Sequence, residues 1–259
     1  MQWENLTAKQ FDAARKEYKV CILPLGVLEK HGDHLPLGTD MMLAHKLACK
    51  ATKIEPAVVF PLFYFGQVYE ARCFPGTIAI EPELLLKLLQ NVLDEIGRNG
   101  FKKIIITNQH GGNESFIKFL AMSQLAKNRD YQVYYYTQTE AKRSKVIRET
   151  METSVLGHAC ECETSRMMYY YPDLVDLSET DGMIKPLKRL DHIPSLFTGL
   201  WWYARVPDHV VGDPSKATKA KGETIEVMEA ELLAQFIKAV KHDETLKTLS
   251  QTFHENTQF

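Results

Sequence analysis

Long apolar runs, a strong excess of one charge and a regular cysteine pattern are all missing from this chain of 259 residues. No apolar stretch reaches the roughly 18 residues that a membrane-spanning helix needs, and the first residues lack the basic and apolar segments of a secretion signal. The formal net charge of −2 combines mixed signs and gives no broad basic surface. We therefore expect neither a membrane nor a nucleic acid as a partner.

The five cysteines are an odd number and are scattered except for Cys160 and Cys162, so a secreted disulfide framework is not expected. The single residue between that pair differs from zinc-ribbon spacing, and we expect both side chains to be buried. We also expect a cytoplasmic protein. Because 45% of the residues are hydrophobic and no linker is visible, residues 1–259 are predicted to form one domain.

Short apolar segments alternate with amphipathic ones along the chain. Strands are predicted at residues 20–25, 57–63, 103–107 and 132–137. Helices are predicted at residues 8–18, 41–52, 82–99, 114–128, 140–153, 163–171 and 217–241. Strands separated by helices favour parallel pairing with right-handed crossovers, which predicts a three-layer α/β/α fold around a mostly parallel central sheet. Residues 181–213 are rich in proline, glycine and aromatic residues and have no predicted element.

Two carboxylates and two imidazoles lie in a span of twelve residues after the first predicted strand: Glu29, His31, His34 and Asp40. Zinc, manganese and iron accept such oxygen and nitrogen donors. An extended backbone would project Glu29 and His31 to one side, where they either hold one ion each or share one. The glycine- and proline-containing loop can fold back to bring in Asp40, whose two oxygens can bridge two cations. The alternative is an ordinary polar loop that binds nothing.

A second polar cluster follows the strand at 103–107. His110 is followed by Gly111 and Gly112, which allow close backbone approach, and Asn113 can cap the next helix. Considered alone, this segment is a helix-capping turn. Because the carboxyl ends of parallel strands meet at one edge of a sheet, His110 is predicted to join the first cluster.

A third cluster contains His158, Glu161 and Glu163. His158 is a candidate general acid and base, since the ordinary pKa of histidine lies near neutrality. Glu163 either complements the dipole of the helix that it opens or serves at the metal site.

These segments together resemble the creatininase (creatinine amidohydrolase) family, and the resemblance covers nearly the whole chain. The matching stretches are residues 26–40, 74–77, 108–113, 158–165, 212–214 and 221–222. The resemblance implies a layered α/β fold, a two-metal site, hydrolysis of cyclic or linear amides, and a homo-oligomer, commonly a hexamer.

By position, the resemblance implies that Glu29 and His110 hold one metal ion with Asp40, and that His31 holds the other with Asp40 as the bridge. His158 matches the proton-shuttling histidine of the family. Creatininase itself has a metal-binding carboxylate where this chain has Gly112. The second ion therefore needs a replacement ligand, Glu161 or Glu163, and we favour Glu161.

The substrate is expected to differ from creatinine, because Ser154 and Val155 stand where creatininase has the tryptophan that closes over its substrate. Relatives with the Gly-Gly form act on other amides, including a formamido-pyrimidine and a peptide precursor of a redox cofactor. We predict metal-dependent hydrolysis of a carbon–nitrogen amide bond in a small polar molecule, with zinc as the leading metal and manganese or iron as alternatives. A relative that binds a metabolite through the metal without turnover is the second hypothesis. A serine hydrolase is not expected, because the chain has no Gly-x-Ser-x-Gly segment.

Overall fold

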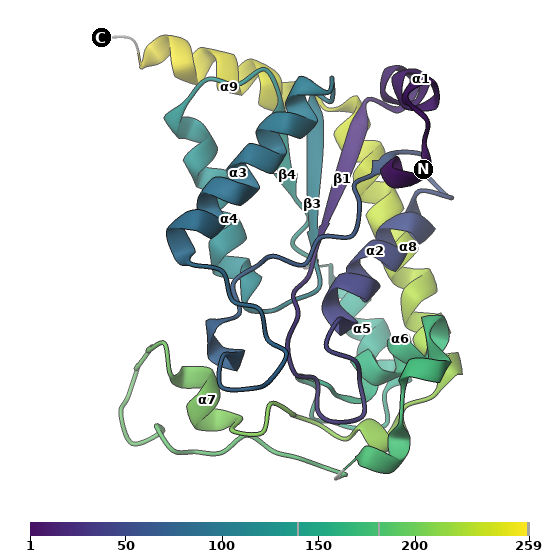
Figure 1. The fold of residues 1–259 in the computed structure, drawn as a ribbon, viewed down its shortest axis with the longest axis vertical. Coiled ribbons are helices and arrows are strands. Elements are labelled where there is room, and N and C mark those ends of the chain that lie inside the picture. The colour runs from purple at the N-terminus through teal and green to yellow at the C-terminus, as the bar shows by residue number, and fades with distance from the viewer. Residues whose placement is uncertain (139, 181, 258–259) are drawn as a thin grey trace.

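The computed structural model describes residues 1–138, 140–180 and 182–257. Within these ranges, four parallel strands form a sheet in the order β2-β1-β3-β4 (Figure 1). Their bounds are β1 Val20–Leu25, β2 Val58–Val59, β3 Lys103–Asn108 and β4 Gln132–Tyr135. Because Leu25 lies opposite Asn108 in the register, β1 and β3 end at the same level. The loops that follow them therefore start side by side.

Helices cover both faces of this sheet. Their bounds are α1 Ala8–Tyr18, α2 Thr39–Ala51, α3 Pro82–Arg98, α4 Asn113–Ser123, α5 Ala141–Thr150, α6 Glu161–Tyr170, α7 Trp201–Arg205, α8 Lys219–His242 and α9 Thr245–Asn256. One apolar core joins the sheet to α1, α3 and α4, and another joins it to α2, α5 and α8 (Figure 1). The predicted three-layer α/β/α fold with a parallel sheet is confirmed.

The alternation of side chains along β1 explains why its sequence is apolar throughout. Val20 and Ile22 belong to the core under α2 and α8, whereas Cys21, Leu23 and Leu25 belong to the core under α3 and α4. A strand that is covered on both faces needs apolar residues at every position. All six of its residues are buried.

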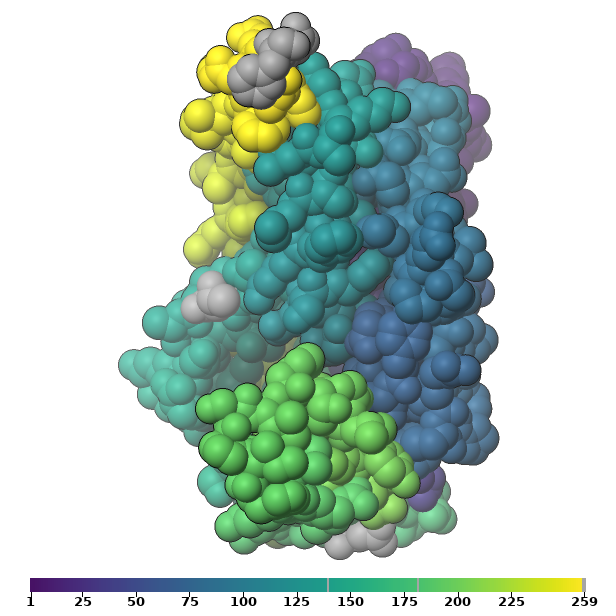
Figure 2. Space-filling view, turned by 90° about the vertical axis from the view of Figure 1, so that its left-hand side faces the viewer, coloured from purple at the N-terminus to yellow at the C-terminus, as the bar shows by residue number. Residues whose placement is uncertain are grey.

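Several elements differ from the prediction. β2 has only two residues of the predicted seven, since Pro61 has no N–H to donate to the ladder. The helices α7 and α9 were not predicted. The start of α9 carries a local signal, because the carboxylate of Asp243 accepts hydrogen bonds from the backbone N–H groups of Thr245 and Leu246. Residues 182–213, for which no element is predicted, contain α7 and lie at the lower end of the molecule (Figure 2).

Among the described residues, none of the helices has the length and apolar character of a membrane span.

The carboxyl ends of the strands point toward the end of the molecule that residues 182–213 cover (Figure 1). This is the edge of the sheet at which parallel α/β folds bind ligands.

Candidate metal centre

Four of the predicted ligands meet at the carboxyl ends of β1 and β3. Nδ1 of His110 lies 2.9 Å from Oε1 of Glu29 and 3.1 Å from Oδ2 of Asp40. Nε2 of His31 lies 3.2 Å from the other oxygen of Asp40, Oδ1. None of the four is more than 5% exposed. Asp40 thus turns one oxygen to each histidine, in the arrangement of a bridging carboxylate.

The backbone at Gly26 explains how Asp40 reaches the cluster. A Cβ atom on Gly26 would lie 2.2 Å from the backbone nitrogen of Met41, so only glycine allows the end of β1 to touch the first turn of α2. The backbone N–H of Glu29 then donates to the carbonyl of Leu37 at 3.1 Å and closes the loop between them. The loop folds back, as its glycine and proline content predicts.

Three histidines of the site each bond to a backbone carbonyl through one ring nitrogen. The pairs are Nδ1 of His31 with the Glu29 carbonyl at 3.2 Å, Nε2 of His110 with the Gln67 carbonyl at 2.8 Å, and Nε2 of His158 with the Lys30 carbonyl at 2.7 Å. A carbonyl oxygen only accepts, so the bonded nitrogen carries the proton. In the neutral ring, the other nitrogen of each histidine therefore presents its lone pair to the cluster.

The lone pairs of His31 and His110 face carboxylate oxygens, which need a cation between them. Oε1 of Glu29 and Oδ2 of Asp40 are fully buried and have no hydrogen-bond partner among the described residues. Two groups of ligand atoms lie within 4.8 Å of one another: Glu29, Asp40 and His110, and Glu29, His31 and His158. The donor set fits a divalent metal ion better than it fits a closed hydrogen-bond network.

The charges of the cluster oppose the effect of burial. Burial alone would lower the pKa of His31, but Asp40 and Glu29 raise it to about 9. Burial likewise works against the charge of His110, yet Glu29 and Asp40 raise its pKa well above the ordinary value. Burial would raise the pKa of Glu29, but the charge of His110 and the hydrogen bonds with His110 and His209 hold it well below the usual range. The carboxylates therefore stay ionised, and a metal ion that enters must displace protons from histidine.

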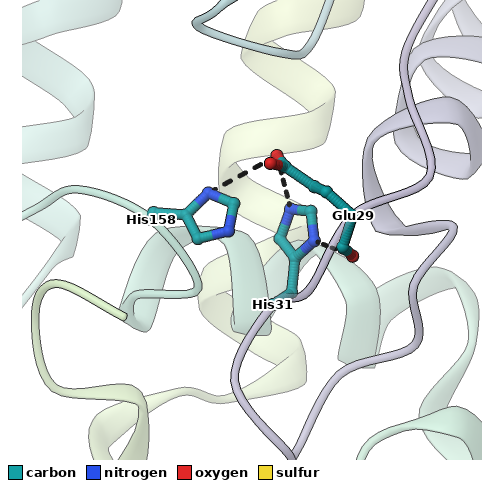
Figure 3. A group of neighbouring side chains, drawn as sticks. All are labelled: Glu29, His31 and His158. Carbon is teal, nitrogen blue, oxygen red and sulfur yellow. Dashed lines mark hydrogen bonds and ion pairs between the residues drawn. The ribbon is translucent and has the colours of Figure 1, made fainter. Parts of the chain in front are cut away.

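His158 lies beside the cluster, where Figure 3 shows it facing Glu29 and His31. Its Nδ1 is 3.7 Å from Oε1 of Glu29, and its ring centroid is 4.1 Å from that of His31. Burial and the positive charge on His31 lower the pKa of His158 to about 3. His158 is thus a neutral imidazole, and its open Nδ1 faces the site.

His209 belongs to the site and was missed by sequence reasoning. It is 1% exposed, and its Nε2 lies 2.9 Å from Oε2 of Glu29. The indole N–H of Trp202 donates to its Nδ1 at 3.1 Å. Because an indole N–H only donates, Nε2 of neutral His209 carries the proton and donates to Glu29. His209 therefore offers no lone pair to a metal and holds one oxygen of Glu29, which leaves the other, Oε1, for the cation.

The two carboxylates considered as replacement ligands lie in different surroundings. Glu161 does not reach the cluster: its oxygens accept hydrogen bonds from the backbone N–H groups of Glu152 and Thr153, from the Thr153 hydroxyl and from Nζ of Lys221. Glu163 accepts one bond, from the backbone N–H of Ala159 at 2.6 Å. Burial raises the pKa of Glu163 to about 7, with His31 lowering it and Asp40 raising it. Glu163 thus interacts electrostatically with His31 and Asp40, whereas the oxygens of Glu161 are engaged by other partners.

The ends of the Glu70 and His110 side chains occupy the space beside Gly112. A Cβ atom there would lie 2.4 Å from Oε1 of Glu70 and 2.5 Å from Nε2 of His110. The remaining residue of the first cluster, His34, pairs through its Nε2 with the hydroxyl of Thr164 at 3.0 Å.

A parallel α/β/α fold with buried carboxylates, imidazoles and an open neutral histidine at its strand ends defines a metal-dependent hydrolase. The sequence profile of the family described as Creatininase, creatinine amidohydrolase, matches residues 4–237. The chain belongs to the creatininase family.

Individual relatives are similar over most of their length. The creatinine amidohydrolase of Pseudomonas putida is 28% identical over 248 residues, which cover 89% of this chain and 90% of the relative. The mycofactocin precursor peptide peptidase of Mycolicibacterium smegmatis is 31% identical over 217 residues, or 79% of this chain and 78% of the relative. A solved creatinine amidohydrolase homologue from Bacteroides fragilis is 26% identical with a TM-score of 0.80, and the match covers 95% of this chain and 98% of that one.

Proposed function

We propose that this chain hydrolyses a carbon–nitrogen amide bond in a small polar molecule with the help of one or two divalent metal ions. The observation that carries the proposal is the orientation of the histidines. Backbone carbonyls hold one nitrogen of His31, His110 and His158, and the opposite nitrogens face buried carboxylates. Such a preorganised donor set is typical of a catalytic metal site.

Glu29, Asp40 and His110 are proposed to hold one ion. His31 is proposed to hold the second with Asp40 as the bridge, and Glu163 takes the place of the carboxylate that Gly112 cannot supply. Mixed oxygen and nitrogen donors suit zinc first and also manganese or iron. Solved creatininases include a Zn–Zn form and a manganese form.

A metal ion in this site supplies a water molecule of lowered pKa and polarises the substrate carbonyl. A residue of the chain transfers the proton from the water to the leaving nitrogen. His158, whose Nε2–H stays bonded to the Lys30 carbonyl, accepts the proton of the attacking water at Nδ1. It then returns that proton to the leaving nitrogen as the carbon–nitrogen bond breaks. His209 holds Glu29 in position, since it donates to Oε2 of Glu29 and leaves Oε1 for a metal ion.

The substrate is proposed to be an amide other than creatinine. The relatives named above act on different molecules, creatinine in one case and a precursor peptide in the other, so membership of the family does not identify the substrate. Residues 154 and 155 supply no aromatic ring, whereas the ring of Trp202 lies 5.9 Å from that of His158. Trp202 is therefore the aromatic wall proposed for this site. A homo-oligomer is proposed from the family, and five free cysteines suit a cytoplasmic location.

The test combines metal analysis with a panel of lactams, formamides and short peptides. The metal-loaded chain is expected to hydrolyse at least one class, and Asp40→Ala is expected to lose metal content and turnover together. Asp33→Ala, an exposed carboxylate in the same loop, serves as the matched control. Full activity of metal-stripped Asp40→Ala would refute the proposal. Tight metal and ligand binding without any turnover would support the alternative, a metal-dependent metabolite-binding protein.

A further inference from the structure

A cavity of about 440 Å³ opens directly beside the metal centre. His110 and Glu163 belong to its wall, and so do three residues that the proposed reaction does not use: Gln109, Arg143 of α5 and Arg166 of α6. Two guanidinium groups in one cavity beside a reactive centre need an explanation. Arginine is the side chain best suited to bind planar or tetrahedral anions through paired hydrogen bonds.

Two glutamates of helix α8 bind the two arginines. Nε of Arg166 donates to Oε1 of Glu226 at 2.5 Å, and Nε of Arg143 donates to Oε1 of Glu229 at 2.6 Å. The two glutamates are 0% exposed and stand three residues apart, on one face of the helix. Each arginine is thus held through its Nε, which leaves its two terminal nitrogens available for other partners.

Two buried donors in the wall of this cavity lack acceptors. Nη1 of Arg166 donates to Oε1 of Gln109 at 2.7 Å, which leaves the amide nitrogen of Gln109 as a donor. This nitrogen and Nη2 of Arg166 are both buried and have no partner among the described residues. Arg166 itself is only 4% exposed. Buried donors without acceptors destabilise a fold, so their presence in the wall of this cavity indicates a ligand that supplies the acceptors.

We propose that this cavity binds an anionic, oxygen-bearing group of the substrate, a carboxylate or a phosphate, through Arg143, Arg166 and Gln109. The inference rests on the proposed hydrolase function, because the amide to be cleaved must lie at the adjoining metal centre. Glu226 and Glu229 balance the two guanidinium charges in the empty cavity. The anionic group brings oxygen acceptors for the unpaired donors, and these charge-assisted hydrogen bonds are stronger than those to a neutral group.

The test uses three matched probes on the metal-loaded chain: N-formylglycine, N-formylaminomethylphosphonate and the uncharged N-formylglycinamide. Calorimetry measures binding, and a separate assay measures hydrolysis. We expect the better anionic probe to bind about tenfold to hundredfold more tightly than the uncharged one. Whether the carboxylate or the phosphonate is preferred identifies the natural group.

Variants distinguish the cavity from direct anion binding at the metal. Arg143→Gln is expected to reduce the preference for the anionic probe about tenfold and to act on KM more than on kcat. Arg143→Lys keeps the charge but lacks the planar guanidinium group. Its preference for the anionic probe is expected to lie between those of Arg143→Gln and the unchanged chain. Lys142→Gln is the control, because Lys142 also pairs α5 with α8, through Glu231 at 3.2 Å, outside the cavity. Its preference is expected to match that of the unchanged chain.

The outcomes separate the two proposals. Binding of an anionic probe that depends on Arg143 but leads to no hydrolysis supports the cavity and counts against the hydrolase. Equal binding and hydrolysis of all three probes supports the hydrolase and overturns the cavity. Absence of binding, or binding that Arg143→Gln and Lys142→Gln affect equally, also overturns it.

Discussion

The loops that follow β1 and β3 differ from residues 182–213 in how they serve the site. The first two carry Glu29, His31 and His110, the side chains proposed to hold metal, within a few residues of a buried strand. Residues 182–213 lack a strand and contribute His209, which donates to Glu29, and Trp202, which donates to His209. The comparison teaches that Glu29, His31 and His110 are placed by local strand geometry, whereas the side-chain hydrogen bond that supports Glu29 comes from a distant part of the chain.

The largest effect is expected from Glu29→Gln, which tests the first region. Glu29 belongs to both groups of candidate ligand atoms, so loss of its charge is expected to weaken both. Loss of several kcal/mol of charge stabilisation corresponds to at least about a hundredfold loss of kcat. Metal analysis and turnover on the best panel substrate measure it. Asp33→Asn, in which the replaced side chain is 73% exposed in the same loop as Glu29, should match the unchanged chain. Normal turnover of Glu29→Gln would contradict the assignment.

The pair Glu163→Gln and Glu161→Gln tests the two carboxylates that α6 presents. Glu163→Gln is expected to reduce the content of the second ion and to slow turnover while the protein stays folded. Glu161→Gln is expected to keep its metal but to lower the free energy of unfolding by roughly 1–3 kcal/mol, because it weakens buried bonds to Lys221 and the backbone. Metal analysis and denaturant unfolding measure the two effects. The reverse result would restore Glu161 as the ligand.

A smaller effect is expected from the second region. His209→Ala removes the donor to Oε2 of Glu29, and loss of such a supporting hydrogen bond is expected to weaken metal affinity about tenfold to hundredfold. Trp202→Phe keeps the ring but not the indole N–H, so a weaker loss is expected. Trp201→Phe is the control, since Trp201 is 39% exposed. Chelator competition measures affinity in each variant. Unchanged affinity in His209→Ala would mean that Glu29 needs no support from residues 182–213.

The sequence predicts the strands and most helices, because the spacing of apolar residues reveals them. It also predicts that Glu29, His31, Asp40 and His110 meet, because the two strands before them end at the same edge of the sheet. The bounds of β1 and α1 agree with the structure residue by residue, since each has a sharp start, an apolar run for β1 and the Thr7 cap for α1. A local sequence pattern is enough to predict an element whose ends are set by neighbouring residues.

The choice between Glu161 and Glu163 depends on how α6 is rotated against α8, which no local pattern records. A Cβ atom on Gly222 would lie 1.9 Å from the carbonyl oxygen of Ser165, so the two helix backbones are in contact there. This contact fixes the rotation that turns Glu161 toward Lys221 and Glu163 toward the cavity. His209 is hidden for a similar reason, since its partner Glu29 is 180 residues away in the sequence.

The last prediction compares how the stabilities of the metal-free and the metal-loaded protein depend on pH. In the metal-free protein, burial lowers the pKa of His31, but Asp40 and Glu29 outweigh it and raise the pKa from 6.5 to about 9. Protonated His31 therefore stabilises the metal-free fold fully below pH 6.5, and this contribution is lost as the pH rises to about 9. A metal ion must displace that proton, so metal affinity is expected to rise over the same window. Thermal unfolding of both forms from pH 6 to pH 9 should show the gap in Tm widening with pH, and His31→Gln should flatten the metal-free curve. A gap that stays constant, with no proton released on metal binding, would mean that His31 carries no proton in the metal-free site.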